Sequence, residues 1–250
     1  MSNHLSLRSG NPVLKANTFI QRQTTIDTGT MTITGTVNKT ALGLLLLMTT
    51  AIFTWNMAPT DPRMSALMMV GIFGGLIAAM ITVFKRHLAP YTTPIYALLE
   101  GLALGGISRF FETLYPGIVN QAVFLTFGTL AALLFAYQSG LIKPTENFKL
   151  GIVAATGGIF FVYIISFILG LFGVQVPLIH SNSNFGILFS FGVVVIAALN
   201  LVLDFDFIEE GAEIGAPKYM EWFGAFGLLV TLVWLYLEIL HLLAKLQSRR

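Results

Sequence analysis

The chain has 250 residues, of which 55% are hydrophobic and only 10% are charged. Soluble domains carry roughly 25% charged residues, so this composition excludes an ordinary soluble protein and predicts a surface that faces lipid. The formal net charge of +2 comes from Lys and Arg spread thinly between apolar runs, which argues against a nucleic-acid-binding protein, and the absence of cysteine excludes disulfides and thiolate metal sites.

The first 37 residues are polar and contain no apolar core of the kind found in a cleaved signal peptide. We expect residues 1–37 to form a mobile tail and residues 38–250 to form one transmembrane domain. Within that domain, apolar runs of roughly 20 residues, the length that crosses a bilayer, predict seven membrane helices. The predicted spans are residues 40–57, 65–84, 94–111, 118–137, 150–172, 185–207 and 222–246.

These runs are continuous, whereas strands of a membrane barrel would alternate apolar and polar residues, so the predicted fold is all-α. Pro94 is expected in the first turn of its helix, where the missing N–H costs nothing. Ala97, Gly101 and Gly105 recur at four-residue spacing and predict a close helix–helix contact.

Basic residues concentrate in cytoplasmic loops, and this rule favours a cytoplasmic N-terminus. The cytoplasmic side would then hold Arg8, Lys15, Arg22, Lys39, Lys85, Arg86, Lys143, Lys149 and Lys218. The outer side would hold Arg63, Arg109, Lys245, Arg249 and Arg250. The basic C-terminal end therefore falls on the less basic side, so either seven spans are correct or the run 94–111 or 222–246 does not cross fully.

A charge near the bilayer centre costs at least ~3 kcal/mol, so each ionisable residue inside an apolar run needs a reason. Glu100 lies within the third run, either as a protonated carboxyl bonded to another helix or as a wall of an ion path. Asn200 precedes Asp204 by four residues, so the two share a helix face, whereas Asp206 points elsewhere and is expected to begin an acidic, solvated segment.

The last run carries Glu238, with His241 three residues later and Lys245 seven residues later, all on one stripe. The plain interpretation of His241 is a buried neutral imidazole or a headgroup contact, and that of Lys245 is snorkelling to the interface. Since consecutive helices usually pack together, Asp204 and Glu238 are expected to face each other and to share a proton, as a pH-sensitive latch.

The residues around these two acids resemble the Bax inhibitor-1 family, the transmembrane Bax-inhibitor-motif proteins, and in particular its bacterial members. Val202-Leu203-Asp204 is similar to the Leu-Tyr-Asp-like setting of an acid near the end of the family's sixth helix. Leu235-Tyr236-Leu237-Glu238 is similar to a Leu-Tyr-Leu-Asp run in the seventh, with Glu in place of Asp. The long polar tail and the acidic segment 208–221 depart from the family pattern.

The resemblance implies a seven-helix bundle with the last helix at its centre. It also implies that Asp204 and Glu238 are a pH sensor for calcium leak and that Lys85 or Arg86 is a basic latch. The resulting hypothesis is a pH-sensitive calcium or other cation leak channel in a bacterial inner membrane, with Glu100, Asn200, Asp206 and His241 along the pathway and with calcium as the permeant ion rather than a cofactor.

Two alternatives remain open at the level of the sequence: a non-conducting membrane regulator that binds other membrane proteins, and a proton-coupled transporter. An enzyme is not expected, because neither HExxH nor GxSxG occurs. No metal site is assigned, because the histidines are scattered at His4, His87, His180 and His241. The lipid bilayer is the one partner that the composition itself implies.

Overall fold

The computed structural model describes residues 29–173 and 183–249, and these residues form long helices with a single isolated β-bridge. The all-α prediction is confirmed. In chain order the helices are α2 (Ile33–Trp55), α3 (Pro62–Phe84), the short 3-10 helix η3 (Arg86–Leu88), α4 (Ala89–Leu114), α5 (Ile118–Gln138), α6 (Glu146–Leu171), α8 (Asn184–Glu213) and α9 (Met220–Gln247).

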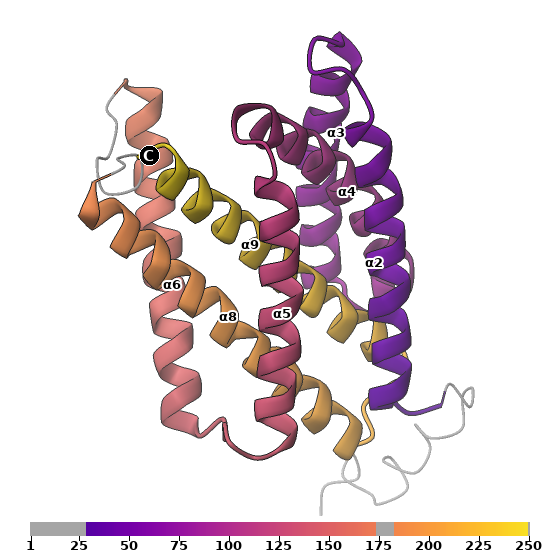
Figure 1. Cartoon of the computed structure of the whole chain (residues 1–250). Helices are drawn as coiled ribbons and strands as arrows, with labels where there is room; N and C mark the ends of the chain where they lie inside the picture. The colour runs from indigo at the N-terminus through magenta and orange to yellow at the C-terminus, as the bar shows by residue number, and fades with distance from the viewer. Residues whose placement is uncertain (1–28, 174–182, 250) are drawn as a thin grey trace, which may run out of the picture.

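The long helices alternate in direction, so that α2 begins at the lower end of the bundle and the C-terminus lies at the upper end (Figure 1). We call the end that holds Ile33 and Met220 the lower end, and the end that holds Trp55 and Gln247 the upper end. The lower end is fixed by a hydrogen bond from the Met31 amide to the Ala216 carbonyl, at 2.7 Å. The start of α2 therefore lies beside the turn between α8 and α9.

Helix α9 is the centre of the bundle. It packs against α2, α4, α5 and α8, and 56% of its most apolar segment is buried, against 11–33% for the other helices that could cross a membrane. Leu229, Leu235 and Leu240 are completely buried. The expectation of a central last helix is confirmed.

Helix α4 is flanked by α2 and α3, which pack along it on two sides. The stripe Ala97, Gly101 and Gly105 forms the α2 contact: a Cβ at Gly101 would lie 2.2 Å from the Leu47 carbonyl oxygen, and one at Gly105 would lie 2.1 Å from that of Ala51. Only a hydrogen fits in these places, so the predicted close contact is confirmed.

Six of the described helices are long and apolar enough to cross a membrane, and α4 is not among them. Glu100, Arg109 and Glu112 lower its apolar character. Since α2 and α3 cover two sides of α4, only part of its surface is exposed, through residues such as Ile95, Phe110 and Leu114, and α4 can run through the bundle without being as apolar as a solitary span. The seven-helix bundle is therefore retained, with one helix more polar than the rest.

Several helix ends differ from the sequence-based expectations. α2 begins at Ile33, inside the expected tail, whose residues 1–28 lie outside the described part of the chain. α4 begins at Ala89, so Pro90 occupies the first turn and Pro94 lies inside the helix. α8 continues to Glu213, because its acidic end is helical rather than a loop.

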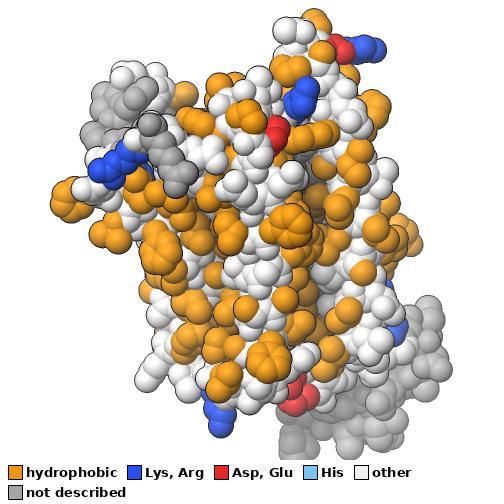
Figure 2. Space-filling model, viewed as in Figure 1, with side chains coloured by type: hydrophobic (Ala, Val, Ile, Leu, Met, Phe, Trp, Pro, Cys, Tyr) orange, Lys and Arg blue, Asp and Glu red, His pale blue; other side chains and the backbone are white. Residues whose placement is uncertain are grey.

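The outer surface is dominated by large apolar side chains between the two ends, whereas charged side chains gather at the ends (Figure 2). On α3 alone, Phe73, Leu76 and Ile77 are each more than half exposed. Exposed apolar surface of this extent is stable only against hydrocarbon, so the chain is a multi-pass integral membrane protein.

Candidate functional site

Asp204 lies on α8 and faces α9. Its Oδ1 atom is 3.4 Å from the position that a Cβ at Gly227 would occupy, and Thr231 is its side-chain hydrogen-bonding neighbour one turn further along α9. Its Oδ2 atom is buried and has no hydrogen-bond partner. Gly227 makes room for the carboxyl group at the helix contact, yet one carboxyl oxygen remains unsatisfied.

Glu238 is only 6% exposed, and its Oε1 atom accepts two hydrogen bonds. The Tyr163 hydroxyl of α6 donates at 2.8 Å, and the Trp234 indole donates at 3.2 Å from the preceding turn of α9. Glu238 thus joins α6 to the central helix, although those two helices make little other contact.

The structure does not bring Asp204 and Glu238 together. Asp204 lies opposite Thr231, and Glu238 follows Thr231 by seven residues, which is a rise of about 10 Å along a helix. Among the described residues, no hydrogen bond joins the two carboxyl groups. The expected sharing of one proton between them is therefore not a feature of this conformation.

Instead, Thr231, Glu238 and Lys245 form a polar stripe at seven-residue spacing along α9, and each binds a neighbouring helix. Lys245 donates to the Ser190 hydroxyl at 2.7 Å and to the Gly186 carbonyl at 3.2 Å, both on α8. Lys245 is therefore fastened to α8 rather than extended to the interface.

Two further polar contacts of α8 lie on the same side of the bundle, toward α6. The Asn200 side chain donates to the Thr156 hydroxyl at 2.8 Å, and Asp206 pairs with Lys149 at 2.5 Å. With the α9 stripe, these contacts make a polar file between α6, α8 and α9 that runs from Asp206 at the lower end to Lys245 at the upper end. Asp206 is thus ion-paired rather than merely solvated.

The remaining candidates lie elsewhere. Glu100 faces α3, with its Oε2 atom 2.9 Å from where a Cβ at Gly75 would be, so it is outside the polar file. His241 is exposed and stands edge-on to the Phe111 ring, with centroids 5.4 Å apart. This exposure contradicts the buried imidazole and agrees with the headgroup contact, the other interpretation of His241.

Of the two basic latch candidates, Arg86 stacks over the Phe223 ring at 5.2 Å, near the start of α9. No ion pair connects Lys85 or Arg86 to Asp204 or Glu238 in the described residues. The aromatic side chain of Phe223 also contacts Phe207 of α8, at 6.0 Å between centroids, so Arg86 lies against the α8–α9 contact without reaching either acid.

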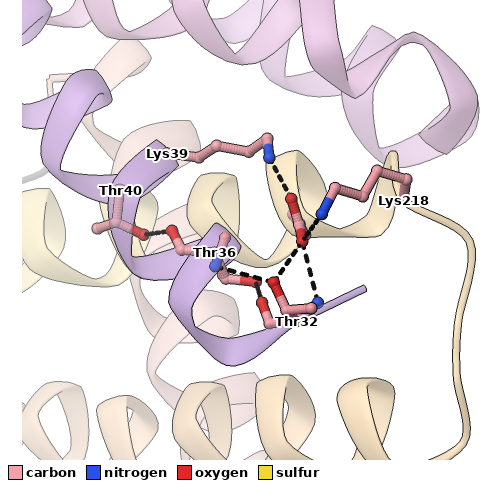
Figure 3. A network of polar contacts seen from close by, with 7 residues as sticks. Thr32, Thr36, Lys39, Thr40 and Lys218 are labelled. Carbon is pink, nitrogen blue, oxygen red and sulfur yellow. Dashed lines mark hydrogen bonds and ion pairs between the residues drawn. The ribbon is translucent and has the colours of Figure 1, made fainter. Parts of the chain in front are cut away.

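Glu221 is a buried carboxylate with several partners, although it belongs to the acidic segment 208–221, which is expected from its composition to be solvated. Glu221 is fully buried and accepts from Thr32, through its amide at 2.9 Å and its hydroxyl at 2.8 Å. Lys218 at 2.8 Å and Lys39 complete the set (Figure 3). The sequence indicates one of these contacts, because Lys218 lies three residues before Glu221 near a helix start, a spacing that allows an ion pair. The contact with Thr32 depends on the fold, which brings the start of α2 beside the start of α9.

Across residues 29–173 and 183–249, no three His, Asp or Glu side chains lie close enough together to hold a metal ion.

The fold and the buried polar file define a multi-pass membrane protein built around a polar central helix. A family model described as Bax inhibitor 1 like matches residues 11–248, so the chain belongs to that family. Neither a curated protein nor a solved structure matches the chain.

Proposed function

We propose that this protein is a pH-sensitive leak pathway for calcium or other cations, in a bacterial inner membrane with a cytoplasmic N-terminus. The observation that carries the proposal is the buried Oδ2 atom of Asp204, which has no hydrogen-bond partner. A buried oxygen of this kind is costly unless a proton or a cation satisfies it. Protons and cations would then compete for one place, which couples flux to pH.

In this proposal Asp204 and Glu238 are two successive cation-binding positions along the pathway rather than one proton-sharing pair. Asp204 has an unsatisfied oxygen, whereas Glu238 is held by Tyr163 and Trp234. A cation that leaves Asp204 would reach Glu238 about 10 Å further along α9. Release of Glu238 from Tyr163 would then be the step that opens the upper half of the file.

The lower end supports entry of a cation. A groove of about 1020 Å³ opens there, and its lining includes Asp206, Glu209, Glu210 and Glu213. An acidic mouth raises the local concentration of cations. Lys143 and Lys149 also line the groove, but Lys149 is paired with Asp206, so the lining keeps an excess of negative charge.

Arg86 and Lys85 would act on this pathway indirectly. Because Arg86 rests on Phe223 and Phe223 touches Phe207, movement of Arg86 would shift the lower part of the α8–α9 contact, close to Asp204. Glu100 lies against Gly75 of α3 and the His241 ring packs on Phe111 of α4, so neither is included in the proposed pathway. We propose no enzymatic activity.

The test is calcium flux into liposomes that hold a fluorescent indicator, measured between pH 5 and pH 8 with the purified full chain. We expect Asp204→Asn to lower the flux and to remove its pH dependence, and Glu238→Gln to alter the flux at every pH. The matched control is Asp61→Asn at the start of α3, where the carboxylate pairs with the exposed Arg63 and belongs to neither α6, α8 nor α9. Unchanged flux and pH response in both Asp204→Asn and Glu238→Gln would refute the assignment.

A non-conducting regulator is the second candidate, and one observation favours it. Glu238, Asn200 and Lys245 each have a hydrogen-bond partner on a neighbouring helix, as structural polar pairs do. If the wild-type chain carries no calcium at any pH, these pairs are structural and the regulator is favoured.

A further inference from the structure

A second, mainly apolar compartment lies in the upper half of the bundle, between α2 and α5. Each of these helices packs against α4, α8 and α9, and α9 passes behind the space between them (Figure 1). The compartment measures about 330 Å³, which is within the range of small-ligand pockets. Met48, Ile52 and Phe127 line it and are 40–54% exposed, so it opens toward the surrounding lipid.

The buried polar groups in this compartment are already paired. The Ser108 and Tyr236 hydroxyls bond to each other at 2.6 Å, and the Thr126 hydroxyl donates to the Ala122 carbonyl at 2.8 Å. Water is retained in a cavity only where several polar groups need it. An empty space would forfeit dispersion contacts of its lining, so a hydrocarbon chain is the occupant that the compartment fits.

A cationic group without a counterion lies beside the upper end of the compartment. Arg109 directly follows Ser108, and its guanidinium lies 5.7 Å from the ring of Trp55, which lines the compartment. The Arg109 Nε atom is buried with no hydrogen-bond partner, and Arg109 makes no ion pair within the described residues.

The nearest acid along the helix, Glu112, is already engaged by the amides of Gly117 at 2.7 Å and Val119 at 3.1 Å. Trp55 is the last residue of α2, which places this end at the level of the lipid head groups, where Trp is enriched. Arg109 therefore offers unused donors at the depth of lipid phosphates, next to an apolar compartment.

We propose that this compartment binds one phospholipid from the leaflet at the upper end, with an acyl chain between α2 and α5 and its phosphate on Arg109. Guanidinium and phosphate match in charge and in bidentate geometry. The lining excludes water and admits hydrocarbon, and the open side lets the lipid enter from the bilayer. This site is separate from the polar file and does not depend on the proposed cation flux.

The test uses a phosphatidylglycerol probe with a photoactivatable diazirine in its acyl chain, added to the full chain in nanodiscs, with crosslinks mapped by mass spectrometry. We expect crosslinks to concentrate on residues lining the compartment, such as Val123 and Ile52. Loss of a charge-assisted hydrogen bond is worth about tenfold in affinity, so Arg109→Gln should lower crosslinking at these positions about tenfold. The control Arg63→Gln removes an exposed charge at the same end and should have no such effect.

Filling the compartment gives an independent test. Val123 lines the compartment, so Val123→Trp should fill it and abolish crosslinking of the lipid probe to residues of α2 and α5 that line it. Leu125 is on the exposed face of α5, so Leu125→Trp should leave this crosslinking unchanged. If a variant misfolds, the positions of the lipid crosslinks on the wild-type chain still test the proposal. Crosslinks spread evenly over all lipid-facing helices, or crosslinking unchanged in Arg109→Gln, would overturn it.

Discussion

Glu221 fastens the start of α2 to the start of α9, and replacing it with Gln is expected to loosen both helices at the lower end. Its carboxylate is fully buried and bound by Thr32, Lys39 and Lys218. Thr32 is also the N-cap of α2, since its hydroxyl accepts from the Gly35 amide at 3.0 Å. One side chain therefore supports both the cap and the helix–helix contact.

The magnitude follows from these partners. Breaking a buried ion pair costs about 3–5 kcal/mol. The side chains of Lys39 and Lys218 are 20% and 46% exposed, so both can turn toward water or lipid phosphates, which reduces the loss. Gln still accepts one hydrogen bond from Thr32. We therefore expect Glu221→Gln to cost about 2–3 kcal/mol, mostly from the charge removed from the Thr32 and lysine contacts.

Hydrogen exchange of the Thr32 amide measures this loss directly, because that amide donates to Glu221 at 2.9 Å. A cost of 2–3 kcal/mol corresponds to exchange that is about 30- to 150-fold faster. Thermal unfolding in detergent should show the same direction. Glu146→Gln is the control, since its carboxylate makes one 3.5 Å ion pair and is 85% exposed. Exchange of Thr32 that differs by less than about twofold from wild type would refute the assigned role of Glu221.

Two other predictions address the packing and the polar file. Gly105→Ala should destabilise the α2–α4 contact by about 1–3 kcal/mol, because the added Cβ would meet backbone atoms of α2. Gly128→Ala is the control: it has open space around it, so it should be neutral or slightly stabilising. Thermal unfolding in detergent measures both variants. Tyr163→Phe should cost about 1–2 kcal/mol by removing a donor from Glu238, and Tyr91→Phe, at a 72% exposed position, should leave the midpoint unchanged.

Hydropathy was sufficient to predict the helices, and small residues were sufficient to predict the contact at Gly101 and Gly105. The positions of the helix ends are harder to predict from the sequence. Polar residues at a helix start give no apolar signal, so hydropathy places the first turn of α2 in the tail although Thr36 is fully buried. Likewise, the acidic end of α8 resembles a loop in composition, but Glu209 binds Tyr137 and the chain stays helical to Glu213.

The burial of Asp204 and Glu238 could be predicted, but their separation could not be predicted without the position of the turn. Residues 214–219 connect α8 to α9, so two residues lie opposite each other when they are equally far from that turn. Asp204 is ten residues before Ile214, and its neighbours on α9, Gly227 and Thr231, are eight and twelve residues after Tyr219. Glu238 is nineteen after Tyr219, and so it lies about two turns beyond Asp204.

The basic C-terminal end, which conflicted with the charge rule for orientation, has a structural explanation in its contacts. An odd number of crossings places Ile33 and Gln247 at opposite ends, so the last basic residues must lie away from Lys39 and Lys218. Lys245 is bonded to Ser190, and Arg249 is bonded to Asn184 at the start of α8. Lys245 and Arg249 therefore hold the end of α9 against the start of α8. Their position follows from this packing and not from the rule that basic residues concentrate on the cytoplasmic side.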